Sequence, residues 1–490
     1  MQSARSPALA RALRGTRGTP SHSARRYSSR AVATSLSQHA LRQHQPQQQK
    51  HPLQSTRPLG LRQFPAACSQ TRNASSSSSA DSSEPLRKTP LYDLHLAHGA
   101  KMVPFGGFHM PVQYASQSVS RSHLFTRERA SLFDVGHMVQ RIFAGPGAAR
   151  FLQRLTPSGI EALPEHRSTL SCLLRPDGSG GIVDDTVVTR LAEGRFFVVT
   201  NAACRDKDNA YLDSEMAKWN GEPGHEDLQV TEERLDGQGL VALQGPEAAG
   251  ILARVLEGGP GGLDLKKLLF GQSAYARLKL RGMQLSSPVL ISRGGYTGED
   301  GFEISIPGDE TVDVTEALLA AGPEKVQLAG LGARDSLRLE AGMCLYGHDL
   351  DETTTPVEAG LSWIIPKERR TADAGFYGAD VIASQLVPKS KGGSGVERRR
   401  VGLVVEGAPA REGAEIVSRA QEEGKEPVKL GTVTSGCPSP SLAKNIAMGY
   451  VKDGFHTPGT EVDVLVRGRP RKAVVTKMPF VPTKYWKGEA

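Results

Sequence analysis

Residues 180–219 read GGIVDDTVVTRLAEGRFFVVTNAACRDKDNAYLDSEMAKW, and this stretch sets the pattern of much of the chain. Two runs rich in β-branched and aromatic residues predict strands, and the segment from Arg205 to Trp219 predicts an amphipathic helix. Similar strand and helix units recur before and after this stretch, for example a single strand around 132–142. They interleave without a long uniform parallel pattern, which favours an α+β fold with mixed sheets.

The last part of the chain has a different character. A charged, Gly-rich linker, VPKSKGGSGVERRR (387–400), precedes a series of short strand-like runs separated by Gly and Pro turns. The runs are RVGLVVEG (400–407), KLGTVTSG (429–436), NIAMGYV (445–451), EVDVLVRG (461–468) and RKAVVTKMPFV (471–481). This close spacing predicts a small β-barrel of about 90 residues.

The charge of the chain is unevenly distributed. The formal charge is +8, yet residues 1–80 alone hold eleven Arg, one Lys and no acid. Without those twelve cations, the rest of the chain contains 48 Lys and Arg and 52 Asp and Glu, which gives it a formal charge of −4. The basic character therefore belongs to the leader and does not indicate a nucleic-acid partner.

The leader itself is rich in Arg, Ser, Ala and Gln, which is typical of a mitochondrial transit peptide. Within it, RRYSS (25–29) resembles an organellar processing site, and low-complexity linker follows. We expect a mature protein that starts between Tyr27 and about Leu86. A disordered basic tail is the alternative.

Composition also bounds the class of protein. With 38% hydrophobic residues the chain can bury substantial cores, but no run approaches the roughly 18 to 20 apolar residues that span a bilayer. We therefore expect no membrane association. The five cysteines lie far apart without a C-x-x-C pair, which predicts neither a disulfide framework nor a zinc knuckle.

The pair Asp184 and Asp185 places two carboxylates inside an otherwise apolar strand. Neighbouring side chains of a strand point to opposite faces, so at most one of the two should face a given site. The other should then have a structural task with hydrogen-bond partners, because an unpaired buried charge is costly. The pattern does not choose between them.

A second polar position follows the Gly-rich loop in SRGGYTGEDGFEIS (292–305). The glycines around Tyr296 permit close approach of a ligand, and a P-loop is excluded because G-x-x-x-x-G-K-[ST] is absent. Alternation places Glu303 opposite Phe302 and Ile304, and therefore in a cleft or in water. Water is the commoner outcome for a lone glutamate.

The segment LAGLGARDSLRLEAGMCLYGHDL (328–350) predicts a strand, a turn and a helix. Arg334 and Arg338 lie four apart on one helical face, which suits an anion contact or a solvated ion-pair face with Asp335 or Glu340. Its match to a dinucleotide fingerprint is weak, because the third glycine is missing.

Taken together, these segments resemble the glycine cleavage system T-protein family of mitochondrial aminomethyltransferases. The matching segments span roughly residues 87–486 in order: 87–107, 131–138, 180–189, 293–305, 328–363, 398–411, 431–451 and 478–486. The resemblance implies two intertwined mixed α/β subdomains that bind folate, followed by a small C-terminal β-barrel. It divides the chain into a transit peptide and linker (1–83), the folate-binding region (84–390) and the barrel (396–490).

The resemblance also implies a reaction. The methylene of an aminomethyl group on the lipoyl arm of H-protein passes to tetrahydrofolate, ammonia is released, and methylenetetrahydrofolate and dihydrolipoyl H-protein form. Tetrahydrofolate is then a co-substrate, and no metal, flavin or nicotinamide is expected. The implied setting is glycine catabolism in the mitochondrial matrix.

The family's functional residues carry over where the motifs match. The essential carboxylate falls on Asp185, the folate-contacting glutamate on Glu303, and the substrate-contacting arginine on Arg334. Further substrate positions are Tyr485, Asn201, Tyr296 and Met138. Where the family commonly has Ser, this chain has Gly136, which removes one local hydrogen-bonding group.

Two other hypotheses fit parts of the pattern. A flavin-dependent demethylating dehydrogenase uses a similar folate module, but it needs a dinucleotide domain with a G-x-G-x-x-G opening, which this chain lacks. A folate-binding protein without transferase activity would carry a Cys-containing Gly motif where this chain has GGYTGEDG (294–301). Both differences favour the aminomethyltransferase.

Overall fold

The computed structural model describes residues 85–258, 262–419 and 427–489, and the predicted leader lies outside them. The first large sheet has six strands in the order β10-β11-β12-β9-β3-β13. Its strands are β3 (Ala130–Asp134), β9 (Gly239–Gln244), β10 (Ser273–Ala276), β11 (Val289–Arg293), β12 (Gly301–Ile306) and β13 (Val326–Ala329). The pair β13 and β3 is parallel and the other pairs are antiparallel, so the sheet is mixed as expected.

The second large sheet has five antiparallel strands in the order β5-β6-β7-β4-β8. They are β4 (Val139–Ala144), β5 (Ser168–Leu174), β6 (Ile182–Ala192), β7 (Arg195–Thr200) and β8 (Thr231–Arg234). The chain enters this sheet after β3 and returns to the first sheet at β9, so the two α/β subdomains are intertwined.

The predicted single strand around 132–142 is wrong, because the chain breaks there into β3 and β4, which belong to different sheets. The break follows Asp134, whose carboxylate accepts a hydrogen bond from the backbone N–H of Gly136 at 2.8 Å. The same carboxylate accepts one from the Thr89 hydroxyl at 2.6 Å. These bonds turn the chain out of the first sheet.

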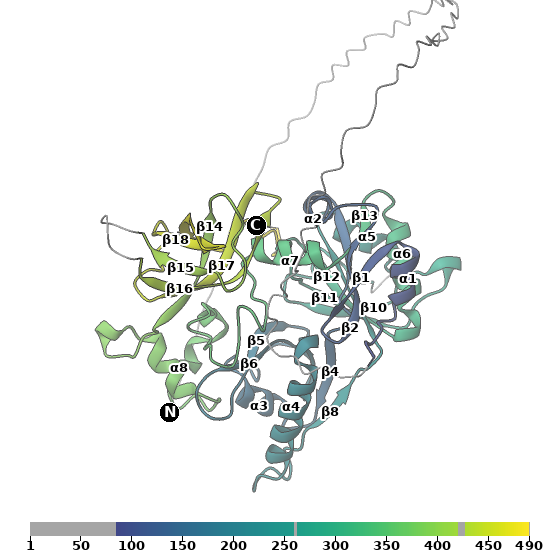
Figure 1. Cartoon of the computed structure of the whole chain (residues 1–490). Coiled ribbons are helices and arrows are strands. Elements are labelled where there is room, and N and C mark those ends of the chain that lie inside the picture. Colours follow the sequence, from purple (N-terminus) through teal and green to yellow (C-terminus); the bar gives the residue numbers. More distant parts are fainter. Residues whose placement is uncertain (1–84, 259–261, 420–426, 490) are drawn as a thin grey trace, which may run out of the picture. The chain divides into compact units, whose positions relative to one another are not determined.

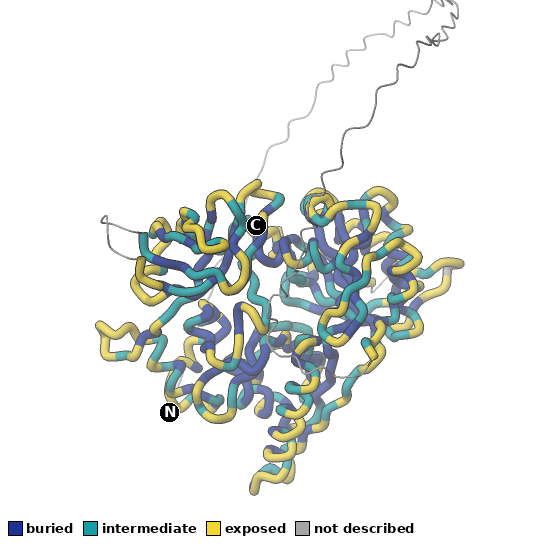
Figure 2. Tube along the Cα trace, in the orientation of Figure 1, coloured by how far each residue is buried: buried dark blue, intermediate teal, exposed yellow. Residues whose placement is uncertain are grey.

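Helices cover both sheets. One core joins the six-stranded sheet to α1 (Tyr92–Ala97), α5 (Ala248–Val255) and α6 (Thr311–Ala321). A second joins the five-stranded sheet to α3 (Ala148–Leu155) and α4 (Arg205–Asn220). The buried positions follow these strands and the inner faces of the helices (Figure 2).

Three helices and one hairpin complete the part of the chain that precedes the C-terminal strands. They are α2 (Val119–Glu128), α7 (Leu331–Glu340), α8 (Ala379–Leu386) and the two-stranded sheet of β1 (Ala100–Phe105) and β2 (Phe108–Tyr114). Among the helices of the described residues, none combines the length and the apolar character that crossing a bilayer requires.

The C-terminal strands close into a barrel in the order β14-β17-β16-β15-β18-β19 (Figure 1). They are β14 (Arg398–Val405), β15 (Glu415–Ser418), β16 (Lys429–Ser439), β17 (Lys444–Lys452), β18 (Glu461–Val466) and β19 (Arg469–Thr476). The predicted barrel is confirmed, and β15 is the strand that the sequence pattern missed, because only four residues of it pair. The α+β fold class with a C-terminal barrel is therefore confirmed.

Candidate active site

The paired acids Asp184 and Asp185 lie in the part of β6 that pairs with β5 but no longer with β7. The pairing of β6 with β7 begins at Thr186, opposite Thr200, so Asp184 and Asp185 lie beyond its end. On the other side, Leu173 of β5 pairs with Asp184 but Leu174 pairs with Ile182, which leaves Val183 as a bulge. A bulge and a free ladder edge both re-aim side chains, and they occur often beside active sites.

Asn201, the residue directly after β7, joins the two acids. Its backbone N–H donates to Asp184 Oδ2 at 2.9 Å, and its side-chain Nδ2 donates to Asp184 Oδ1 at 2.8 Å. The same Nδ2 donates to Asp185 Oδ1, also at 2.8 Å. Both carboxylates therefore reach one nitrogen at the end of the ladder, although exposure still alternates along β6, from the buried Asp184 to the half-buried Asp185 and the buried Thr186.

The two acids nevertheless differ in exposure. Asp184 is 0% exposed, whereas Asp185 is half-buried and remains accessible. Burial, with the nearby charge of Asp184, raises the pKa of Asp185 to about 7. Burial raises the pKa of Asp184 as well, with a further contribution from Asp208. Asp185 is thus the carboxylate that a substrate can reach.

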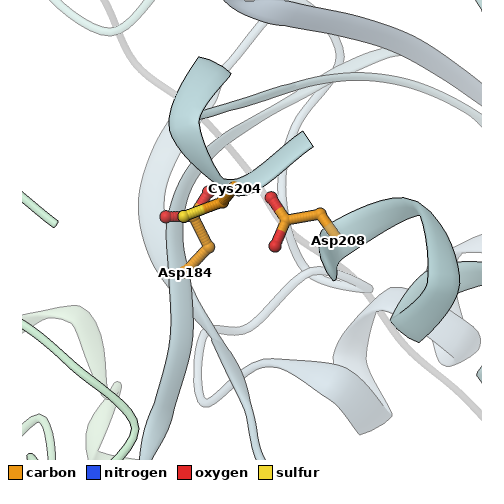
Figure 3. Close-up of side chains that lie close together, drawn as sticks. All are labelled: Asp184, Cys204 and Asp208. Atoms are coloured by element: carbon orange, nitrogen blue, oxygen red, sulfur yellow. The ribbon is translucent and has the colours of Figure 1, made fainter. Parts of the chain in front are cut away.

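Behind Asp184 lies a cluster that sequence reasoning missed. Asp184, Cys204 and Asp208 each bring one potential ligand atom within 4.8 Å of the others (Figure 3). Cys204 ends the short 3₁₀ turn Ala202–Cys204, and Asp208 lies in the first turn of α4. Both oxygens of Asp184 already accept N–H groups, and burial raises the pKa of the Cys204 thiol. A cation at this cluster would have to displace the thiol proton and share the Asp184 oxygens with these N–H groups.

Glu303 and Arg334 form a second group. Phe302 and Ile304 are fully buried, and Glu303 points to the opposite face of β12, as alternation predicts. Burial raises the pKa of Glu303, and the nearby Arg334 guanidinium opposes that rise. Glu303 is half-buried, so its surroundings are a protein site and not open water.

Arg334 lies near the N-terminus of α7. Its guanidinium lies over the Tyr296 ring, 4.7 Å from the ring centroid. Its Nη1 is buried and has no hydrogen-bond partner among the described residues. An unpaired buried guanidinium nitrogen indicates a missing acceptor. Tyr296 in turn donates to the backbone carbonyl of Cys344, and its hydroxyl feels the charge of Asp185. Tyr296 therefore contacts Arg334 and lies within electrostatic range of Asp185.

The two arginines of α7 have different tasks. Arg338 is buried and pairs with Asp335 at 2.9 Å and with Asp349 at 2.7 Å. It also donates to the Ser435 hydroxyl of the barrel at 3.0 Å. Arg338 therefore makes the expected ion pair with the exposed Asp335, but the arginine itself is buried and its other acidic partner, Asp349, lies inside the protein, so this face is not solvated as a whole.

The remaining predicted positions lie around this centre. Met138 packs beside Ala333 and Leu337 of α7, next to Arg334. Tyr485 lies in the C-terminal segment beside the Gly-rich loop, where the backbone N–H of Lys484 donates to the Gly298 carbonyl at 2.8 Å, and its ring stacks on Phe270 at 4.1 Å between centroids. Burial raises the pKa of Tyr485 to about 12, and its charged neighbours are Arg127 and Glu299.

A second missed residue is His137, which is buried and whose Nδ1 has no partner among the described residues. Burial, opposed by Asp134 and assisted by Arg334 and Arg205, lowers the pKa of His137 to about 4. It is therefore neutral at physiological pH. Its sequence context, DVGHM (134–138), gave no signal beyond a lone histidine. A cavity of about 630 Å³ lies elsewhere, against the barrel, and contains none of these residues.

The chain matches known proteins over most of its length. Residues 91–369 match the family described as "GCVT N-terminal domain", and residues 398–482 match the "Glycine cleavage T-protein C-terminal barrel domain". The "Probable aminomethyltransferase, mitochondrial" of Schizosaccharomyces pombe is 48% identical over 84% of this chain and 97% of its own length. The human "Aminomethyltransferase, mitochondrial" is 48% identical over 82% of this chain and 92% of its own. The crystal structure of the glycine cleavage system aminomethyltransferase T from Bartonella henselae is 39% identical, with a TM-score of 0.70 over 82% of this chain and 100% of that one.

Proposed function

Because this chain belongs to the glycine cleavage T-protein family, we infer that Asp185, Glu303 and Arg334 form the active site of an aminomethyltransferase of the glycine cleavage system. The enzyme transfers a one-carbon unit. The donor is the aminomethyl group on the lipoyl arm of H-protein, and the acceptor is tetrahydrofolate. The C–S and C–N bonds of the donor break, ammonia leaves, and the products are methylenetetrahydrofolate and dihydrolipoyl H-protein.

Glu303 and Arg334 suit recognition of the pterin ring. The ring offers its 2-amino group and an adjacent N–H as two parallel donors, and one carboxylate can accept both. Glu303 has the right chemistry and is half-buried. The unpaired Nη1 of Arg334 would meet either the pterin carbonyl or the anionic glutamyl tail. Tyr296, Met138 and Tyr485 would complete the walls of the site.

Asp185 suits the chemical step. Positive charge develops on the methylene and amine as either bond breaks, and a fixed carboxylate nearby stabilises that charge. The observation that supports this role is the Asn201 bridge, which holds the accessible Asp185 against the buried Asp184. Fixing the carboxylate before the reaction avoids reorganisation during it.

The names of the relatives support a mitochondrial location, and the acid-free leader is consistent with import. We place the enzyme in the matrix, where lipoylated H-protein would be its partner. Neither nucleic acid nor a membrane belongs to the proposed partners.

Ammonia release from aminomethylated H-protein, measured with and without tetrahydrofolate, tests the function. We expect rapid release that depends on tetrahydrofolate and produces methylenetetrahydrofolate in equal amount. Release that ignores tetrahydrofolate, or none at all, would contradict the proposal. A visible absorption spectrum of the same preparation tests the expectation of no flavin.

A further inference from the structure

Asp208 is an acid for which the proposed chemistry has no use. It is 0% exposed, and neither of its carboxylate oxygens has a hydrogen-bond partner among the described residues. An ionised carboxylate in that situation costs several kcal/mol. Something must therefore offset its charge or supply a hydrogen.

Lys207 and Arg141 favour the charged form of Asp208 from a distance, but neither cation donates a hydrogen bond to it among the described residues, because both donate to other groups. The Lys207 ammonium donates to the Val183 carbonyl at 2.6 Å and to the Tyr346 hydroxyl at 2.7 Å. The Arg141 guanidinium pairs with Glu232 at 2.6 Å. The titratable and charged groups that face Asp208 are Asp184, Cys204, Lys207, Arg141, Tyr211 and Tyr346.

Asp184 is the group that can complete the hydrogen bonding of Asp208. The Asp208 carboxylate, on α4, is turned toward Asp184 of β6 and Cys204 (Figure 3), and a carboxylate oxygen of each acid lies within 4.8 Å of the other. Two buried carboxyl groups this close cannot both ionise, and burial raises the pKa of both, that of Asp208 to about 6. One retained proton gives the pair the hydrogen that neither carboxylate has by itself.

We propose that Asp208 is a positioning residue that shares one proton with Asp184 and thereby holds Asn201 and the Asp185 carboxylate in place. The inference rests on the role proposed for Asp185. The path runs from Asp208 to Asp184, from both Asp184 oxygens to the backbone and side-chain nitrogens of Asn201, and from Asn201 Nδ2 to Asp185. Asp208 touches no substrate and acts only along this path.

The shared proton has a consequence for turnover. When it leaves at alkaline pH, the pair gains a second negative charge next to Asp185, with no donor between the two carboxylates. Their repulsion displaces Asp184 from Asn201, and Asp185 loses its fixed position. Turnover of the wild-type enzyme should therefore fall on the alkaline side, while the KM for tetrahydrofolate stays nearly constant.

Two substitutions of Asp208 separate this role from a merely structural one. Asp208→Asn supplies a permanent N–H donor to Asp184 and has no proton to lose, so we expect it to retain most of the turnover at neutral pH without the alkaline fall. Asp208→Ala removes the donor, and we expect kcat to drop about ten- to a hundredfold with a much smaller change in KM. Asp206→Asn, at an exposed acid in the same turn of α4, is the matched control.

A readout independent of activity distinguishes this inference from the proposed function. Asp185 loses its own proton near pH 7. Infrared difference spectra of the wild-type enzyme should show, in addition, a carboxylic acid C=O band that persists after Asp185 has ionised and disappears together with the alkaline fall in kcat. This second band should be absent in Asp208→Asn, which keeps the band of Asp185, and unchanged in Asp206→Asn. This measurement holds even if Asp208→Ala fails to fold.

Any of three results would overturn the inference: an alkaline fall that persists in Asp208→Asn, no protonated carboxyl at neutral pH, or a metal bound in stoichiometric amount at this cluster. The first would show that another group titrates, and the last would replace the proton by a cation. Wild-type enzyme that shows the band but releases no ammonia would instead contradict the proposed function.

Discussion

Replacing Asp185 by asparagine removes one charge from the site and changes little else. The two side chains have nearly the same shape, and the amide oxygen of asparagine can still accept the hydrogen bond that Asn201 donates to Asp185 at 2.8 Å. Asp184 keeps both of its bonds to Asn201. We therefore expect Asp185→Asn to fold normally and to bind tetrahydrofolate nearly as well as the wild type.

The expected loss of turnover follows from the charge. A carboxylate about 4 Å from a developing unit positive charge contributes about 4 kcal/mol at an effective dielectric constant of about 20. Each 1.4 kcal/mol or so is about tenfold in rate, so the upper limit is roughly a thousandfold. Removal of a single preorganised polar group from other active sites costs about a hundred- to a thousandfold in kcat. We expect a loss within that range.

Ammonia release measured as a function of pH gives a second signature. Only the ionised form of Asp185 stabilises a cation, and its pKa is raised to about 7. Wild-type kcat should therefore fall as the pH drops through about 7. Asp185→Asn should lack this step, and Asp313→Asn, at an exposed acid of α6, should keep it.

The thermal stability of Asp185→Asn should rise although its turnover falls. A carboxyl group whose folded-state pKa is raised favours the folded state at low pH, and that contribution is lost as the pH rises through the folded pKa. Above pH 7 the wild type therefore bears the cost of a desolvated charge that asparagine lacks. We expect the melting temperature of Asp185→Asn to equal or exceed that of the wild type at alkaline pH, with the difference shrinking toward acid.

Asp184→Asn is the decisive comparison. Both Asp184 oxygens accept N–H groups, and an amide can replace only one of them, which should cost about 1–3 kcal/mol of stability. Its melting temperature should fall while its kcat falls less than that of Asp185→Asn. If Asp185→Asn turned over normally and Asp184→Asn were folded but inactive, the assignment of the two acids would be reversed.

Three further predictions concern recognition and targeting. Glu303→Gln presents an N–H to the donors of the pterin ring. Calorimetry should therefore show that the affinity for tetrahydrofolate is weakened roughly 5- to 150-fold, while docking of H-protein is unchanged. Unchanged affinity for tetrahydrofolate would place Glu303 outside the site. Arg334→Lys keeps the charge but loses the planar guanidinium and its stacking on Tyr296. The KM for tetrahydrofolate should therefore rise by a larger factor than kcat falls. A KM equal to that of the wild type would argue against a contact between Arg334 and tetrahydrofolate. N-terminal sequencing of protein from mitochondria should find a start between Tyr27 and about Leu86, and an intact Met1 would contradict the transit peptide.

Local patterns predicted much of this structure because local sequence determines those features. Alternation placed Glu303 opposite Phe302 and Ile304, and the short Gly-punctuated runs predicted the barrel. At Asp184 and Asp185 alternation gave the difference in exposure, but it did not predict that Asn201 would hydrogen-bond to both acids where the pairing of β6 with β7 ends. That contact depends on how neighbouring strands pair, which the residues of one strand do not reveal.

The sequence also did not predict whether a charged residue is buried or exposed. Asp208 lies in a polar helix segment, RDKD (205–208), whose pattern is that of a solvated first turn. Its burial depends on the position of α4 against β6, which only the tertiary structure provides. The same holds for His137, whose unpaired nitrogen results from packing against residues far away in the sequence.

The barrel contributes to the site through α7, although the predicted catalytic acid lies in the five-stranded sheet. Glu340, at the C-terminal end of α7, accepts hydrogen bonds from the hydroxyls of Ser439 and Ser441 at 2.5 and 2.8 Å. Arg338, near the same end, bonds to Ser435 and Asp349. A helix of ten residues is stiff, so hydrogen bonds at the C-terminal end of α7 also hold its N-terminal end in place. Arg334 lies near that N-terminal end. The barrel therefore helps to fix Arg334, and we expect a change at Ser439 to affect the proposed folate site without touching it.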